Sequence, residues 1–179
     1  MIRLGLTTCQ AMPRRTRPEN LTKTEFCRTC AKFPTGVTIV TVLDAEGSPH
    51  GMTASSFTSV SLEPPLVLVC VDHRATVLAH LRGAQHIGFN VLSEDQQALS
   101  EHFARRGHDR FGAVEWYAGR GGVPIIPGAL ASFECSIQSM VDAGDHTIFI
   151  AKVEYVEHSD GRPLVYFGSG YHKLDGETG

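Results

Sequence analysis

A hydroxyl-rich segment between two apolar runs places the strongest constraint on the fold. In HGMTASSFTSVSLEPP, residues 50–65, small polar side chains are interleaved with Phe57, Val60 and Leu62. Even-numbered residues from 52 to 56 fall on one face of a strand and odd-numbered ones on the other, which is typical of a half-buried strand. Two consecutive prolines end it, because proline cannot donate to a β-ladder. The segment predicts one strand, with Phe57, Val60 and Leu62 facing an interior.

The rest of the chain continues this β-rich pattern with a few helical interruptions. β-Branched and apolar runs bounded by turn residues predict further strands, and longer runs with apolar residues at helical spacing predict helices. Strands are expected in residues 35–44, 66–71, 86–92, 129–144, 146–159 and 163–170, helices in 21–32, 75–84 and 93–106, and a loop in 119–128. The predicted fold class is mainly β, a barrel with two or three inserted helices, because a barrel hides the edges of its sheet.

Length and charge limit the organisation and the partners. A chain of 179 residues is expected to form one domain, residues 23–175, after a flexible extension, residues 1–22. The net charge of −3 gives no basic face for nucleic acid or an anionic membrane. The longest apolar run, residues 66–71, is far shorter than the roughly 20 residues that a membrane helix needs. We therefore expect a cytoplasmic protein that contacts neither nucleic acid nor membrane.

The five cysteines include one close pair, Cys27 and Cys30. No second pair completes a zinc motif. Phe26, Cys30 and Phe33 recur at helical spacing, so we interpret these thiols as core residues in a reducing compartment.

Several familiar catalytic motifs are absent. The sequence contains no G-x-G-x-x-G, no G-x-x-x-x-G-K, no H-E-x-x-H and no G-x-S-x-G. Its nine histidines show no ligand spacing, so no metal site is expected. An enzyme without such groups can take its chemistry from a cofactor and supply binding, orientation and electrostatics.

Five segments, taken in order, resemble one family. They are FPTGVTIVT (33–41), GMTASSFTSVSLEPPLVLVCV (51–71), FNVL (89–92), HFARRGHDRF (102–111) and GDHTIFIAKV (144–153). Over residues 24–172 the chain is similar to the flavin reductase-like family of FMN-binding split barrels. The resemblance implies a homodimeric NAD(P)H:flavin oxidoreductase that uses FMN or FAD and NADH or NADPH. It also implies a partner, a flavin-dependent monooxygenase that receives the reduced flavin.

The resemblance also implies where the flavin binds. The hydroxyl-rich segment and the strands after it match the family's flavin-contacting stretches, and the N-terminal amides of a helix starting at residues 74–76 could hold a phosphate. Arginines supply cations for that phosphate because guanidinium groups bind it bidentately. The implied residues are Thr53, Ala54, Ser55, Ser56, Cys70, Val71, Asp72, Thr76, Asn90, Val91, Leu92, Phe103, Arg105, Arg106, Arg110 and Phe111.

On the nicotinamide side the resemblance points to His146, in GDH, and to Tyr171. A direct hydride transfer between cofactors needs no side-chain acid or base, so no catalytic residue is expected. Two alternatives remain at this point: a flavin-binding module without reductase activity, and another oxidase built on the split barrel.

Overall fold

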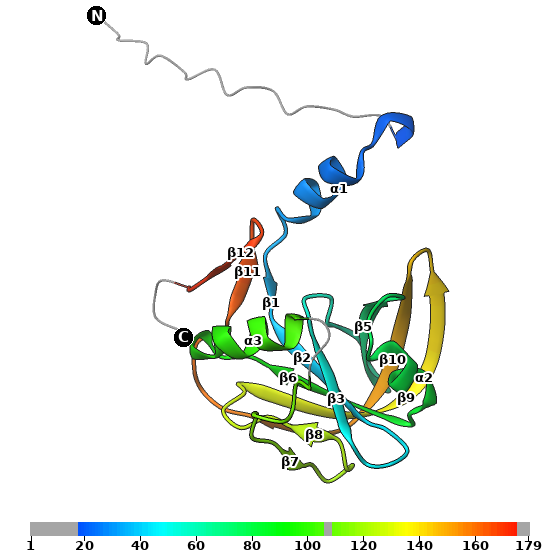
Figure 1. The fold of residues 1–179 in the computed structure, drawn as a ribbon, viewed down its shortest axis with the longest axis vertical. Helices are drawn as coiled ribbons and strands as arrows, with labels where there is room; N and C mark the ends of the chain where they lie inside the picture. Colours follow the sequence, from blue (N-terminus) through cyan, green and yellow to red (C-terminus); the bar gives the residue numbers. More distant parts are fainter. Residues whose placement is uncertain (1–17, 106–108, 175–179) are drawn as a thin grey trace, which may run out of the picture.

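The computed structural model describes residues 18–105 and 109–174. Its centre is a seven-stranded antiparallel sheet in the order β3-β2-β6-β9-β10-β5-β4, which curls into an open barrel (Figure 1). The strands are β2 (Thr38–Leu43), β3 (Pro49–Ala54), β4 (Thr58–Leu62), β5 (Pro65–Asp72), β6 (His86–Val91), β9 (Ala131–Ala143) and β10 (His146–His158). The expectation of a mainly β, split-barrel fold with inserted helices is confirmed.

The hydroxyl-rich segment is the corner that joins the two edges of this sheet. β3 lies at one edge and β4 at the other, and residues 55–57 connect them. Ser56 fastens the corner to β5: its Oγ accepts from the Cys70 amide at 3.1 Å and donates to the Cys70 carbonyl at 3.0 Å. The prediction of one continuous strand is therefore wrong, because the chain changes edges in the middle of the segment.

The predicted interior positions of this segment are also partly wrong. Phe57 packs against Phe89 and Phe133, with ring centroids 5.1 and 5.2 Å away. Val60 is 47% exposed and Leu62 is 91% exposed. β4 is an edge strand with a register shift between Ser59 and Ser61, so alternation along it does not alternate core with solvent.

The core consists of two groups of buried side chains. The larger fills the barrel between β2, β5, β6 and α2 (Leu78–Gly83), and includes Val69, Leu81, Phe89 and Phe149. The smaller lies under α3 (Gln97–Ala104) and includes Ile39, Leu92, Phe103 and Leu164. Burial of these apolar surfaces is the main force that holds the sheet in its curled form.

Two small sheets flank the barrel. β1 (Thr35–Gly36) pairs with β11 (Val165–Phe167), which pairs with β12 (Gly170–His172). β7 (Tyr117–Ala118) pairs with β8 (Pro124–Ile125), and β8 lies inside the stretch predicted to be a loop. That prediction misses β8 because its order comes from tertiary contacts: Ile125 and Ile126 are buried, and Thr41 Oγ1 donates to the Pro124 carbonyl at 2.7 Å.

The expected helices form, with shorter bounds. η1 (Pro18–Asn20) precedes α1 (Lys23–Cys30), and η2 (Glu94–Gln96) leads into α3. A reciprocal capping box between Thr22 and Glu25 starts α1. Within the described ranges, none of the helices is long and apolar enough to cross a membrane.

α1 stands away from the barrel and buries none of its residues (Figure 1). Cys27 and Cys30 are exposed, as are Phe26 and Phe33, so the interpretation of these thiols as core residues is wrong. Helical spacing correctly predicts the apolar face of α1, but the barrel does not cover that face. The greater part of the predicted extension, residues 1–17, lies outside the described residues.

Candidate functional site

Three adjoining cavities line one side of β3, and together we call them the β3 cleft. Their volumes are about 190, 160 and 740 Å³. Thr53 and Ala104 border both the first and the second cavity, and Thr76 and Arg110 border both the second and the third. Because neighbouring cavities share walls, the cleft is continuous from the hydroxyl-rich corner to the start of β3.

At the corner end, one hydroxyl is left unpaired. Thr53 Oγ1 donates to the Ser100 carbonyl at 2.6 Å, and Ser56 is bonded to the backbone of Cys70. Ser55 is exposed and lines the cleft, and its Oγ makes no hydrogen bond to any residue that the structure describes. Of the three predicted hydroxyl groups, Ser55 is therefore the one available to a ligand.

Two tyrosines form the opposite wall of this end. Tyr166 and Tyr171 pair across the β11–β12 hairpin, with ring centroids 5.3 Å apart. The Tyr171 hydroxyl shares a 2.8 Å hydrogen bond with Ser100 Oγ, which ties the hairpin to α3. The predicted Tyr171 thus reaches the cleft, and the sequence analysis missed its neighbour Tyr166.

Arg110 supplies the positive charge at the middle of the cleft. Nη1 donates to the Gly51 carbonyl at 2.7 Å and to Thr76 Oγ1 at 3.3 Å, and Nη2 donates to the Arg105 carbonyl at 2.7 Å. Partial burial lowers the pKa of this guanidinium, which still stays charged at neutral pH. No carboxylate of the described ranges forms an ion pair with Arg110, so its charge can attract an anion.

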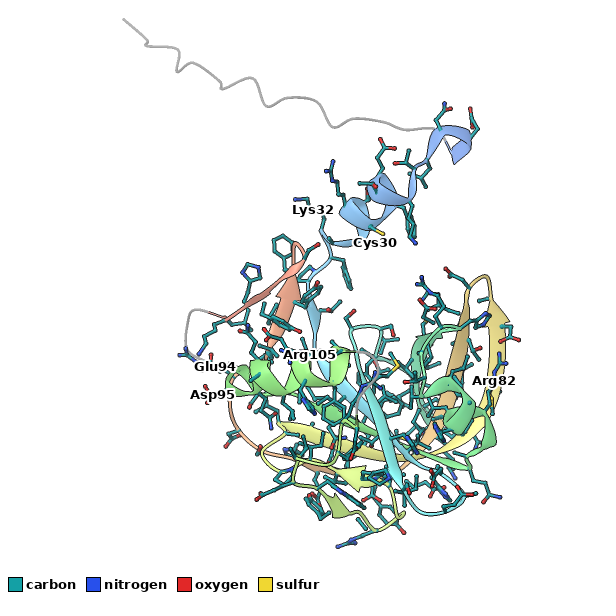
Figure 2. The ribbon with its side chains drawn as sticks, in the orientation of Figure 1. Cys30, Lys32, Arg82, Glu94, Asp95 and Arg105 are labelled. Atoms are coloured by element: carbon teal, nitrogen blue, oxygen red, sulfur yellow. The ribbon has the colours of Figure 1, made fainter. Side chains whose placement is uncertain are left out.

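The other two predicted arginines differ from Arg110. Arg105 lies at the C-terminal end of α3, exposed, and lines none of the three cavities (Figure 2). Its backbone is extended, so it caps the helix instead of forming the helix's last turn. Arg106 lies outside the described residues.

Asp72 and His146 face each other across β5 and β10 at the edge of the cleft. They are register partners, and Asp72 lines the middle cavity. Arg74 donates from Nε to Asp72 Oδ1 at 3.0 Å, and this bond holds the pKa of the carboxyl well below its usual range. His146 Nδ1 lies 2.7 Å from Asp145 Oδ1, and His146 lines none of the cavities itself.

The phosphate site expected at a helix start near residues 74–76 does not form as predicted. α2 begins at Leu78, and the preceding residues form a turn in which Asp72 accepts hydrogen bonds from two backbone amides. The Arg74 amide donates to Asp72 Oδ1 at 2.8 Å, and the Ala75 amide donates to the Asp72 carbonyl at 2.9 Å. The Thr76 side chain, by contrast, does line the cleft.

Several predicted residues lie in the core and not in the cleft. Asn90 is completely buried; its amide group donates to the Ile39 carbonyl at 3.3 Å and accepts from the Ile126 amide at 2.9 Å. That side chain therefore joins β6 to β2 and to the residue that follows β8. Val71 and Leu92 are fully buried, and Cys70 and Val91 line none of the three cavities.

The two predicted phenylalanines belong to the core and also border the cleft. Phe103 and Phe111 are buried and meet edge to face with centroids 5.1 Å apart, and each borders a cavity of the cleft. They form the floor behind Arg110. Ala104 and Trp116 also border the cleft and were missed; a helical alanine and a tryptophan in a loop carry no sequence signal that separates them from ordinary packing residues.

Comparison with known proteins identifies relatives of the whole described domain. The family model described as "Flavin reductase like domain" matches residues 30–175. A probable flavin reductase of Rhizobium meliloti is 49% identical over 139 residues, which are 78% of this chain and 45% of the relative. The reductase component of 4-hydroxyphenylacetate 3-monooxygenase from Thermus thermophilus is 42% identical, over 85% of this chain and 97% of its own length.

A solved structure shows the same architecture. The NADH:FAD oxidoreductase of Streptomyces globisporus, in complex with NAD and FAD fragments, superposes with a TM-score of 0.84 at 36% identity, covering 90% of this chain and 97% of that one. The chain spans about half the length of the first curated relatives that it matches, 45% and 60%.

Proposed function

The chain belongs to the flavin reductase-like family, and we propose that it is an NAD(P)H:flavin oxidoreductase that binds FMN or FAD along the β3 cleft. When bound, the flavin accepts a hydride from the nicotinamide, and reduced flavin then passes to a separate flavin-dependent monooxygenase. Support for the partner comes from the Thermus relative, whose name makes it the reductase component of such a pair.

The observation that carries this proposal is the distribution of free polar groups in the cleft. A flavin needs a cation for its phosphate and hydrogen-bond partners for the polar edge of its ring. The cleft offers the unpaired charge of Arg110 at its middle and the free hydroxyl of Ser55 at the corner. Small residues 53–55 let the ligand approach the backbone of β3 closely.

In this arrangement the protein binds and orients, and no side chain needs to transfer a proton. Arg110 holds the phosphate, Ser55 the ring edge, and Tyr171 and Tyr166 cover the ring from the side of the β11–β12 hairpin. His146 is the register partner of Asp72, at the edge of the cleft. We propose that it contacts the nicotinamide carboxamide, as the family resemblance suggests.

We infer that the preferred donor is NADH. The arginines near the GDH turn are already paired, Arg74 with Asp72 and Arg82 with Asp142, and the His73 ring lies 3.6 Å from Asp142. Asp145 adds another acidic group beside His146. A 2′-phosphate on the adenosine ribose would meet more acidic than free basic groups there, and like charges repel. The Streptomyces relative is also named for NADH.

We further propose that the protein works as a homodimer in the cytoplasm. Leu21, Phe26 and Phe33, on and beside α1, are 46%, 56% and 74% exposed, and the barrel does not cover them. Apolar side chains gathered in this way mark interaction surfaces. Light scattering on the purified protein tests the dimer.

Steady-state assays with flavin-free protein test the proposed activity. NADH and NADPH are each combined with FMN, FAD and riboflavin, and loss of oxidised-flavin absorbance is followed without oxygen. We expect turnover with NADH, and a lower KM for the phosphorylated flavins than for riboflavin. Tight flavin binding without turnover would instead support a non-catalytic flavin-binding module. Neither binding nor turnover would support another split-barrel oxidase.

A further inference from the structure

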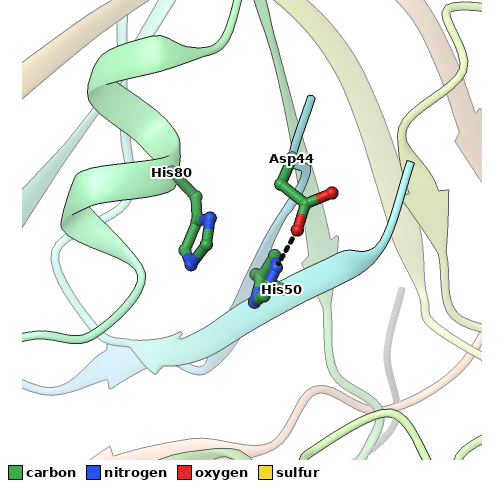
Figure 3. A group of neighbouring side chains, drawn as sticks. All are labelled: Asp44, His50 and His80. Atoms are coloured by element: carbon green, nitrogen blue, oxygen red, sulfur yellow. Dashed lines mark hydrogen bonds and ion pairs between the residues drawn. The ribbon is translucent and has the colours of Figure 1, made fainter. Parts of the chain in front are cut away.

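Three potential metal ligands meet at the closed end of the β2–β3 hairpin, beside the widest cavity of the β3 cleft, which His50 also lines. Asp44 follows β2, His50 lies in β3, and His80 lies in α2 (Figure 3). Their ligand atoms all lie within 4.8 Å of one another. We propose that Asp44, His50 and His80 bind one divalent transition-metal ion of the zinc type.

The separation of the first two ligands already suits a shared ion. His50 Nε2 lies 2.8 Å from Asp44 Oδ2, and the two atoms share a proton in the absence of metal. Zinc binds imidazole nitrogen and carboxylate oxygen at about 2.0–2.2 Å, which in a tetrahedral site places neighbouring ligand atoms about 3.3–3.5 Å apart. An ion can therefore replace that proton once the two side chains separate slightly.

The Asp44 carboxylate is oriented for this role by its other oxygen. Oδ1 accepts from the Ser48 amide at 2.7 Å and from the Glu46 amide at 3.1 Å, which leaves Oδ2 directed at His50. Hydrogen bonds of this kind fix ligating carboxylates in known metal sites.

His80 is the third ligand and is otherwise uncommitted. Its ring stacks on His50 with centroids 3.5 Å apart and an angle of 9° between the planes. Neither ring nitrogen of His80 is hydrogen-bonded to a residue of the described ranges. The lone pair of an imidazole nitrogen lies in the plane of its ring, so two stacked rings cannot both direct a lone pair at one ion. Ion binding therefore requires His80 to tilt out of the stack.

The surroundings allow an ion to enter and favour zinc over magnesium. Asp44 and His80 line a surface cavity of about 560 Å³ that also includes Glu46, and water can complete the coordination. Two imidazoles among three ligands suit zinc, copper or nickel, whereas magnesium and calcium prefer oxygen alone. The bound ion would cross-link the hairpin to α2.

Calorimetry on metal-free, tag-free and flavin-free protein tests the site without reference to reductase activity. Titration with ZnCl₂ should show one ion per chain with a micromolar or lower Kd, and MgCl₂ should show no binding. At saturating Zn²⁺ the melting temperature should rise by about 5 °C.

Asp44→Asn and His80→Gln should each weaken Zn²⁺ binding at least about tenfold and remove the rise in melting temperature. The matched control is His158→Gln, since His158 is exposed at the end of β10 and distant from the cluster in the chain. Binding only at millimolar Zn²⁺, or the same Kd in all three variants as in the parent chain, would overturn the proposal as an adventitious ion only. Because flavin is absent, either result is independent of the proposed reductase activity.

Discussion

Arg110 Nη1 donates to the Gly51 carbonyl at 2.7 Å, so a residue beyond α3 is tied to the middle of β3. A side chain at Gly51 would not fit beside this contact, because its Cβ would lie 2.8 Å from the Val40 carbonyl and 3.0 Å from the Phe103 ring. The contact with Gly51 therefore holds the Arg110 guanidinium at the centre of the cleft in a fixed orientation. A preorganised cation of this kind binds an anion at low cost in side-chain entropy.

Arg110→Lys should raise the KM for FMN about tenfold, because lysine cannot form the planar set of bonds to Gly51, Thr76 and Arg105 that holds the positive charge in the middle of the cleft. The KM for riboflavin, which has no phosphate, should change far less. Steady-state assays with both flavins measure the difference, and Arg28→Lys on exposed α1 is the control. Equal increases for FMN and riboflavin would show that Arg110 shapes the cleft but does not bind the phosphate.

Ser55→Ala should weaken flavin binding, whereas Ser56→Ala should reduce stability. Ser56 bonds both backbone groups of Cys70 at the barrel corner, so its loss should reduce the free energy of unfolding by about 1–2 kcal/mol. Ser55 has no partner among the described residues, so its loss should leave stability unchanged and weaken flavin binding about three- to tenfold. Denaturant unfolding and flavin titration of both variants separate the two roles. Identical behaviour of the pair would contradict the assignment.

His146→Ala should raise the KM for NADH several-fold and leave the flavin Kd within about twofold, because His146 borders the cleft without lining it. Its ring lies 2.7 Å from Asp145, and the substitution removes that contact from an exposed turn at little cost in stability. His158→Ala provides the control. If KM for NADH is unchanged, the nicotinamide does not contact His146.

The strands were predictable where the burial of a strand follows from its own run of residues. β6 is buried over most of its length and β5 buries every second residue, and both were predicted with nearly their observed bounds. β4 was misjudged because its exposure depends on its place at the sheet edge, which sequence alternation does not reveal. Helical spacing identified the apolar face of α1, but the barrel does not bury that face.

The candidate site was predictable in part. Motif order pointed to Ser55, Arg110 and Tyr171, which do meet in the cleft. It pointed equally to Asn90, whose amide is occupied within the core. Tyr166 was missed because it reaches the cleft by pairing with Thr35, from the other end of the chain. The Asp44, His50 and His80 cluster was also missed, because its members come from different elements and their spacing along the sequence matches no ligand motif.

Asp72→Asn should destabilise the protein at neutral pH and have little effect in acid. The Arg74 guanidinium lowers the pKa of folded Asp72 from its ordinary value of 3.8. A carboxyl with a depressed folded pKa adds stability above its unfolded pKa, and this stability is lost as the pH falls through the folded value. The melting temperature of the parent should therefore exceed that of the variant at pH 7, and the difference should shrink as the pH falls below about 3.8, the ordinary pKa of the carboxyl. Asp160→Asn, at an exposed position that forms no ion pair with any residue the structure describes, should show no such convergence. A difference that persists undiminished in acid would mean that Asp72 stabilises the fold through its shape or backbone hydrogen bonds, and not through its charge.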